Sequence, residues 1–347
     1  TSPYTVKNHG RTGRFFMSLK HQNQPFRIFK NCFFPILAAV ALFLTLLFSS
    51  LPASPFQTEP PRSVSDPVSN QNPDSSKQKH FIQWVDFDVT AEAMNQALHY
   101  DITSYLSPCH WDWISLLAFL GARYGGDFSQ YQKADLEQLI QKLQNGSSME
   151  EVTRGMKYYP YYLEAYTAVL GGLVGEYQIQ EPGKPDDSGY SEPVWQSRYG
   201  LKAFSPIARY FPYEDYDDFG ASRSYGFQRR HLGHDFMGQV GTPIICVESG
   251  QVEAIGWNQY GGWRLGIRSF DKKRYYYYAH LRKNYPYHKS LKQGSIVQAG
   301  DVIGYLGRTG YSTEENTNNI DTPHLHFGLQ LIFDESQKDG NNEIWID

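Results

Sequence analysis

Hydrophobic and polar positions divide the chain into segments of different kinds. Residues 32–51 form an uncharged, almost continuous apolar run of about the ~20 residues that cross a bilayer core. Residues 52–80 are rich in Pro, Ser, Gln and Asn, which predicts an extended, flexible linker. Residues 81–177 carry apolar positions at helical spacing, whereas residues 204–347 carry short Gly-bounded runs of β-branched and aromatic residues. The pattern predicts a transmembrane helix, a helical domain and an all-β domain.

The helical segment contains start and stop signals. Thr90 precedes a stretch with apolar residues at helical spacing and is expected to cap its N-terminus. Further helices are expected within 111–124, 134–143, 149–156 and 161–177. No metal-binding or nucleophile motif stands out in this segment. We therefore expect a spacer, an autoinhibitory module or a docking site for a protein partner.

The C-terminal segment is expected to be all-β. Residues 178–203 are rich in Pro, Gly and Asp, which predicts a second linker. After it, strand-like runs such as 251–257, 263–269 and 275–280 follow one another without helices between them. This order predicts an antiparallel sandwich or open barrel for residues 204–347. The whole chain is expected to be multidomain.

Charged residues predict how the apolar run is oriented in a membrane. All charged residues before the run are basic: Lys7, Arg11, Arg14, Lys20, Arg27 and Lys30. The positive-inside rule therefore places residues 1–31 in the cytoplasm and the rest of the chain outside it. We expect a single-pass anchor in the cell membrane. A cleaved signal peptide is the alternative, because Ala53 and Ser54 follow the run.

Composition narrows the class of partner. The formal net charge is −4, and no basic stripe of the kind that binds nucleic acid is evident, so no nucleic-acid partner is expected. The 3 cysteines give no disulfide framework. The 347 residues leave room for about two domains beyond the anchor.

Histidines near the end of the chain carry the candidate chemistry. They occur in His231-Leu-Gly-His-Asp235, Tyr278-Ala-His280-Leu and Pro323-His324-Leu-His326-Phe. Residues two apart in a strand share a face, so His324 and His326 can line one groove. A hydrolytic zinc site has three protein ligands and an open position for water. His231, Asp235 and one of His324 and His326 meet that requirement, and the remaining histidines, above all His280, are free to transfer protons.

These signatures resemble the lysostaphin-type (LytM-like) zinc metallo-endopeptidases, which are peptidoglycan hydrolases. The resemblance covers residues 219–331. It includes a strand-turn-strand segment at 241–252 and a glycine-punctuated hairpin at 293–304.

The resemblance implies a role for each residue of the site. His231, Asp235 and His326 would bind one Zn²⁺ per catalytic domain, and His280 and His324 would form the catalytic pair. Zinc brings the pKa of bound water towards ~7, so water can attack a peptide bond at neutral pH. Which histidine accepts and which donates a proton stays open. The implied function is a membrane-anchored endopeptidase of bacterial peptidoglycan, with its catalytic domain outside the cytoplasmic membrane.

Some positions depart from the family pattern or lie beside it. The stretch 312–322 is longer than usual, which affects specificity, and Gly328 stands where an acidic residue is common, so a contact to a ligand is missing or replaced. His234 is expected to point away from the site. For Tyr225 and His288, ordinary packing is the simpler interpretation.

Two other classes of function are open. The main alternative is a non-catalytic scaffold or regulator that uses the same groove to control another cell-wall hydrolase. A histidine phosphocarrier is a third class, which the expected export disfavours. A lysozyme-type activity of the helical domain would need a well-placed carboxylate; His110, Asp112 and Glu164 are available, but no pattern selects one of them.

Overall fold

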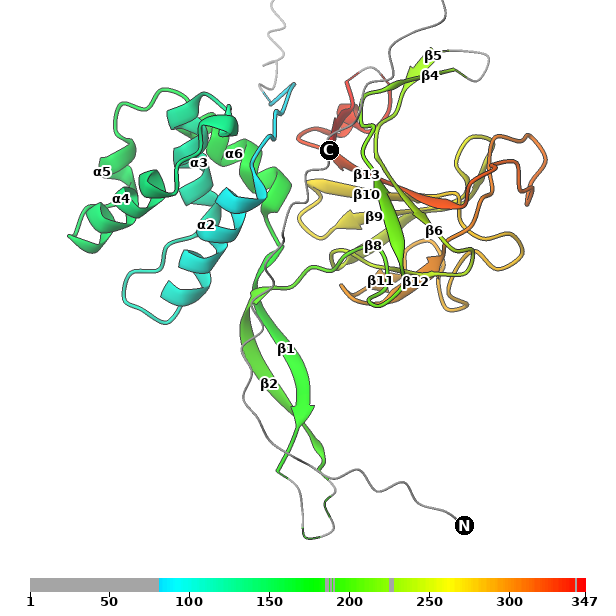
Figure 1. Cartoon of the computed structure of the whole chain (residues 1–347), viewed down its shortest axis with the longest axis horizontal. Helices are drawn as coiled ribbons and strands as arrows, with labels where there is room; N and C mark the ends of the chain where they lie inside the picture. The colour runs from blue at the N-terminus through cyan, green and yellow to red at the C-terminus, as the bar shows by residue number, and fades with distance from the viewer. Residues whose placement is uncertain (1–80, 185–186, 188, 190, 225–227, 341) are drawn as a thin grey trace, which may run out of the picture. The chain divides into compact units, whose positions relative to one another are not determined.

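A computed structural model describes residues 81–184, 187, 189, 191–224, 228–340 and 342–347 (Figure 1). The expected membrane anchor, residues 32–51, lies outside the described residues. Within the part that is described, no helix combines the length and apolarity needed to cross a bilayer.

The helical region follows the predicted order. The described α-helices are α2 (Ala91–Ser104), α3 (Trp113–Tyr124), α4 (Lys133–Gln144), α5 (Met149–Thr153) and α6 (Tyr159–Leu170), with a 3₁₀ turn at Phe128–Gln130. Thr90 caps α2 as expected, because its side chain accepts a hydrogen bond from the backbone N–H of Ala93. Ser148 and Glu151 form a capping box at the start of α5.

The expectation of a helix over 161–177 was wrong for the last residues of that range. Helix α6 ends at Leu170, and Gly172 follows with a φ of 84°, which most other residues avoid. Strands β1 (Val174–Pro182) and β2 (Pro193–Leu201) then form an antiparallel hairpin in register over their full length. Most of the expected linker 178–203 is thus regular structure, although the division into domains stays a prediction.

Tertiary contacts connect this hairpin to the helices. The hydroxyl of Tyr199 on β2 donates to Asp101 Oδ1 at 2.7 Å, and its ring stacks on Tyr105 with centroids 3.6 Å apart. Asp101 is buried and also accepts from the backbone N–H of Trp113. The Pro and Gly content of the segment gives no sign of these contacts.

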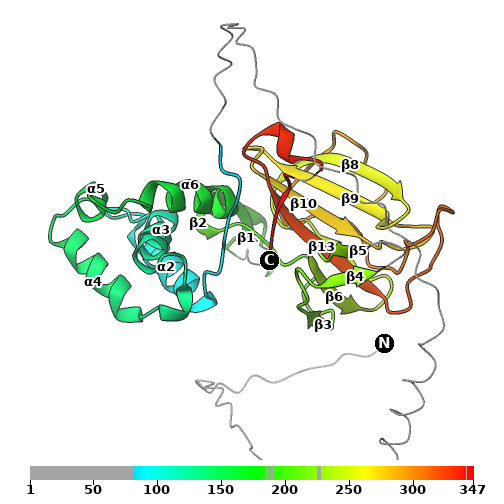
Figure 2. The same ribbon diagram turned by 90° about the horizontal axis from the view of Figure 1, so that it is seen from above.

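The C-terminal region is an antiparallel all-β fold, as expected. Its main sheet has the order β11-β8-β9-β10-β13-β6-β3, and β14 also pairs with β13. Figure 2 shows β8, β9, β10 and β13 side by side. The bounds are β3 (Tyr213–Tyr216), β6 (His234–Gly238), β8 (Gly250–Asn258), β9 (Gly262–Ser269), β10 (Arg274–Ala279), β11 (Ile296–Val297), β13 (His324–Leu331) and β14 (Ile344–Ile346). Smaller pairs are β4 (Ser222–Ser224) with β5 (Gln228–Arg230) and β7 (Pro243–Ile245) with β12 (Val302–Tyr305), and a 3₁₀ turn covers Glu335–Gln337.

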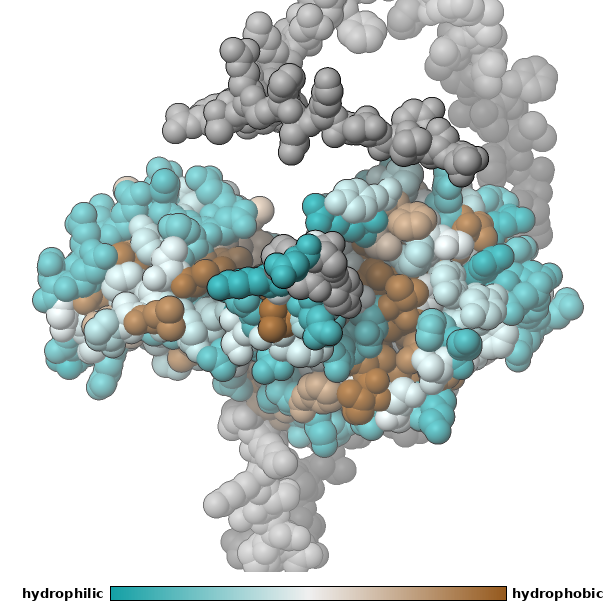
Figure 3. Space-filling model, turned by 90° about the horizontal axis from the view of Figure 1, so that it is seen from below, coloured by the Kyte–Doolittle hydropathy of each residue, from teal (hydrophilic) through white to brown (hydrophobic). Residues whose placement is uncertain are grey.

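The main sheet has one core face and one face that carries the histidines. Leu265, Tyr278 and Leu325, from three neighbouring strands, are fully buried in one apolar cluster. Side chains alternate along a strand, so residues next to these, such as His324 and His326, lie on the opposite face. On the molecular surface seen in Figure 3, apolar areas are interspersed with hydrophilic ones.

Candidate active site

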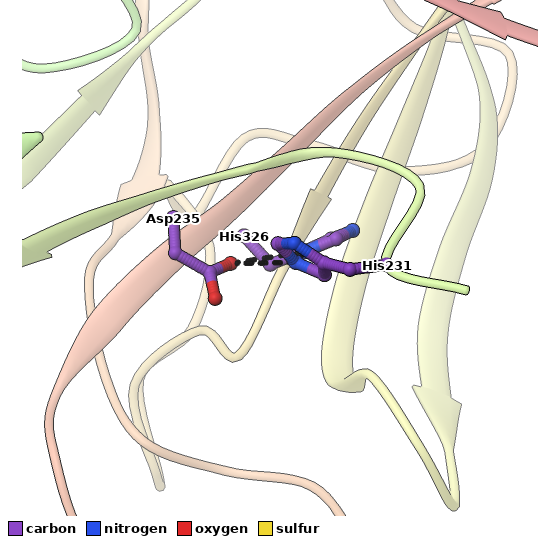
Figure 4. Close-up of side chains that lie close together, drawn as sticks. All are labelled: His231, Asp235 and His326. Carbon is purple, nitrogen blue, oxygen red and sulfur yellow. Dashed lines mark hydrogen bonds and ion pairs between the residues drawn. The ribbon is translucent and has the colours of Figure 1, made fainter. Parts of the chain in front are cut away.

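His231, Asp235 and His326 meet on the face opposite the core. Asp235 on β6 pairs directly with His326 on β13, and paired residues share a face. His231 lies just before β6 and reaches the same point, as Figure 4 shows. His231 Nε2 is 2.8 Å from His326 Nδ1, and each of these nitrogens is 3.1 Å from Asp235 Oδ1. The cross-strand register therefore brings one donor atom of each residue together.

This donor set fits a zinc ion. Two imidazole nitrogens and one carboxylate oxygen are ordinary zinc ligands, and ligands in a tetrahedral zinc site lie about 3.3 Å apart. The observed separations are a few tenths of an ångström shorter. His231 and Asp235 are almost fully buried, and His326 is partly open. This combination leaves one side for a further ligand.

Two charged residues that were not predicted from the sequence, Asp218 and Arg223, contact His231 and Asp235. Asp218 Oδ1 lies 2.7 Å from His231 Nδ1, although the angle is not that of a hydrogen bond. Arg223 donates to Asp218 Oδ2 at 2.5 Å and to Asp235 Oδ2 at 2.9 Å. Arg223 thereby engages Oδ2 of Asp235, whereas His231 and His326 contact Oδ1.

Burial and hydrogen bonding set the charge of this group. Burial alone would raise the pKa of Asp235, but the contacts with His231 and His326 outweigh it and hold that pKa well below its usual range. Burial lowers the pKa of His326, in spite of the nearby carboxylate. An ionised carboxylate beside a neutral imidazole is the protonation state that a metal requires.

His280 and His324 lie together beside the three donor residues. Their ring centroids are 4.8 Å apart, and His324 Nε2 is 3.8 Å from Asp235 Oδ2. His280 Nδ1 lies 2.9 Å from the carbonyl of Thr309, and His324 Nδ1 lies 2.8 Å from that of Thr322. A carbonyl only accepts, so each Nδ1 carries the hydrogen and each Nε2 keeps a free electron pair. Burial, followed by the neighbouring histidines, lowers the pKa of His280 well below its ordinary value.

Comparison with known proteins gives this arrangement a family. Residues 229–339 match the family described as Peptidase family M23. This part of the chain is an M23 peptidase domain. The L-Ala--D-Glu endopeptidase of Bacillus subtilis is 40% identical over 110 residues, which cover 32% of each chain. Lysostaphin of Staphylococcus simulans is 39% identical over 98 residues, 28% of this chain and 17% of lysostaphin.

The crystallised catalytic domain of lysostaphin from Staphylococcus simulans is also similar. It is 32% identical, and the match covers 38% of this chain and 84% of that domain with a TM-score of 0.29. The chain spans at most about a third of the length of the two curated relatives, 32% and 17%. The recognition of a lysostaphin-type peptidase family from the histidine signatures is confirmed.

Two departures of the M23 domain from the family pattern have structural explanations. A Cβ atom on Gly328 would lie 2.7 Å from the ring of Trp345 and 2.9 Å from the carbonyl of Leu232, so a larger residue does not fit. In place of an acidic residue at position 328, Asp218 and Arg223 provide charged contacts to His231 and Asp235 from another part of the chain. Nothing in the sequence indicated the roles of Asp218 and Arg223. Asp218 is one of several acidic residues before His231, and the spacing between these two residues matches no motif.

The longer stretch before Pro323 is tied to the rest of the M23 domain. Asn316 Oδ1 accepts from the indole N–H of Trp263 and from the backbone N–H of Asn284. Arg308 donates to the carbonyl of Ile320 across the same stretch. These contacts give the loop a defined conformation next to His280 and His324.

The remaining candidates lie away from the site or outside the described residues. His234 pairs with Phe327 on the core-facing register and contacts Asp215, as expected for a residue that points away. His288 contacts Ser290 in a loop. Tyr225 lies outside the described residues.

Proposed function

We propose that the chain is a zinc-dependent endopeptidase that cleaves peptide bonds of bacterial peptidoglycan. The observation that carries the proposal is the convergence of His231, Asp235 and His326 beside a second pair of histidines. Membership of the M23 family supports it, as do the names of its relatives. His231, Asp235 and His326 would hold the metal. Zinc bound there would supply activated water at neutral pH and polarise the scissile carbonyl.

His280 and His324 are proposed to carry the proton transfers. Each has its Nδ1–H directed to a backbone carbonyl, which fixes the ring and leaves Nε2 as the basic atom. The lowered pKa of His280 keeps the imidazole neutral at neutral pH, with Nε2 free to accept a proton. Once protonated, Nε2 can donate a hydrogen bond. One histidine would accept the proton of the attacking water, and the other would stabilise the oxyanion or protonate the leaving amine.

We further propose that residues 32–51 anchor the protein in the bacterial cytoplasmic membrane with the M23 domain outside it. Support comes from the apolar run and the basic residues before it. Retention in the membrane after a carbonate wash, together with cleavage of the M23 domain by external protease in spheroplasts, tests this topology. A protein recovered in the soluble fraction would contradict it.

The helical region is proposed to act as a spacer or to dock a protein partner. Among the described residues, the metal-ligating groups all lie in the β region, and none lies in α2 to α6. Co-purification with and without residues 81–170 would reveal a partner bound through these helices.

The decisive experiment uses the purified full-length chain in detergent. Zinc content is measured together with release of peptide fragments from purified peptidoglycan, with and without chelator. We expect one zinc per chain and chelator-sensitive release that Asp235→Ala abolishes. The control is Asp339→Ala, at an exposed position outside the groups of possible metal ligands. Zinc binding without any cleavage would favour the scaffold alternative.

A further inference from the structure

Arg264 lies on the same face of the sheet as the proposed zinc ligands. Leu265 on β9 pairs with Tyr278 on β10, which places Arg264 beside Ala279. Ala279 in turn pairs with His326 on β13. Leu265 is fully buried in the core, so its neighbour Arg264 points to the opposite, histidine-bearing face. With strands about 4.8 Å apart, the Cα atoms of Arg264 and His326 are about 10 Å apart.

Arg264 has both small and aromatic neighbours on this face, because the hydroxyl of Tyr275 on β10 lies over Gly266. Ala279 lies between it and His326, Gly266 follows two residues along the same strand, and Gly256 pairs with it from β8. A Cβ atom on Gly256 would meet nothing within 4 Å, so the face is open on that side. Arg264 is therefore half-buried, with an aromatic neighbour towards β10 and open space towards Gly256 on β8.

Arg264 also lacks an acidic partner. Among the described residues, no carboxylate lies within salt-bridge distance of its guanidinium. Arg268, four residues further along the same face, differs in this respect. Its Nε donates to Glu253 at 2.9 Å, and its Nη1 donates to the carbonyl of Lys272 at 2.8 Å. A guanidinium is a planar fork of donors that matches a carboxylate, so an unpaired one next to a cleavage site is suited to bind an anionic group.

We propose that Arg264 binds a free carboxylate of the substrate peptide. A span of about 10 Å corresponds to about three residues of extended chain, so this carboxylate lies within about three residues of the scissile bond. The preferred substrate is then an anionic stem peptide and not a neutral glycine bridge. The inference rests on the proposed endopeptidase function and specifies which peptides it cleaves.

Two synthetic peptides test the inference on the full-length protein in detergent. They are identical stem peptides except that one carries a glutamate carboxylate near the scissile bond and the other carries the carboxamide. We expect kcat/KM of the wild type to be about 10- to 100-fold higher for the carboxylate peptide, since this is the range of a charge-assisted hydrogen bond. Arg264→Gln should remove this preference, so that kcat/KM becomes equal for the two peptides. Arg264→Lys should keep part of it.

The matched control is Lys292→Gln, which removes an exposed positive charge from a loop and should leave both rates unchanged. Thermal unfolding of each variant shows whether it is folded. The comparison of the two peptides on the wild type tests the inference even if a variant does not fold. Equal cleavage of both peptides by the wild type would overturn the role of Arg264 and leave the endopeptidase function intact. If the zinc-loaded wild type cleaves neither these peptides nor peptidoglycan, the proposed function itself fails.

Discussion

Oδ1 of Asp218 lies 2.7 Å from Nδ1 of His231, the ring nitrogen that faces away from Asp235 and His326. A carboxylate beside this nitrogen would increase the basicity of the imidazole towards a metal bound at its other nitrogen. Arg223 links the same carboxylate to Asp235. The proposed metal ligands His231 and Asp235 thus contact a charged pair that lies before the first histidine signature in the chain.

Replacing Asp218 by Asn should weaken zinc binding. The change removes a negative charge beside His231 and leaves the cation of Arg223 without one of its partners, and both effects oppose a bound metal ion. We expect zinc affinity to fall about 10- to 100-fold, measured by competition with a chromogenic chelator. Asp339→Asn, at an exposed position outside the groups of possible metal ligands, should have no effect. Equal affinities for the wild type and Asp218→Asn would show that Asp218 does not support the site.

Replacing His280 by Gln should separate catalysis from metal binding. His280 is not among the three convergent donor residues, so zinc content should stay unchanged. Loss of a proton-transfer group should lower kcat on peptidoglycan peptides about 10²- to 10⁴-fold. His288→Gln serves as the control, because His288 contacts only a loop serine through its ring. A normal kcat in His280→Gln would remove it from the catalytic pair.

Two arginines offer a matched test of stability. Arg274 is fully buried and makes a two-pronged pair with Glu248, at 2.7 and 3.0 Å. Arg274→Met leaves that carboxylate buried without its cation, with only the hydroxyl of Tyr276 still donating to it, which should lower the free energy of unfolding by about 3–5 kcal/mol. Arg198 pairs with Glu181 at the surface, so Arg198→Met should change it by about 0–1 kcal/mol. Urea unfolding measures both, and similar losses would contradict the difference in burial.

Glu253 should contribute stability that depends on pH. Burial would raise the pKa of Glu253, but Lys338 and Arg268 more than compensate and lower it below the ordinary 4.5. A carboxylate with a lowered pKa in the folded state stabilises the fold above its unfolded pKa and loses this effect as the pH falls through the folded pKa. Glu253→Gln should therefore lower Tm at pH 7, and the difference from the wild type should shrink below about pH 4.5. A difference in Tm that is constant from pH 7 to pH 3 would exclude this linkage.

Local patterns of sequence determined most of the secondary structure. Apolar spacing and caps located α2 to α5 to within a few residues, because helix signals depend on residues three and four apart. The same approach failed after Leu170. Pro and Gly around 178–203 suggested a linker, whereas Tyr199 and Asp101 hold a hairpin there through a contact between residues far apart in the chain.

The sequence by itself determined which residues are candidates for the chemistry. His231, Asp235, His280, His324 and His326 stand in short motifs whose residue types and spacing are visible without any structure. Only the tertiary structure decided how they are used. The register of β6 with β13 places His326, and not His324, opposite Asp235. The β4–β5 hairpin brings Asp218 next to His231. Register between distant strands places Arg264 on the histidine face, and no local pattern encodes such pairings because they form only when the sheet assembles.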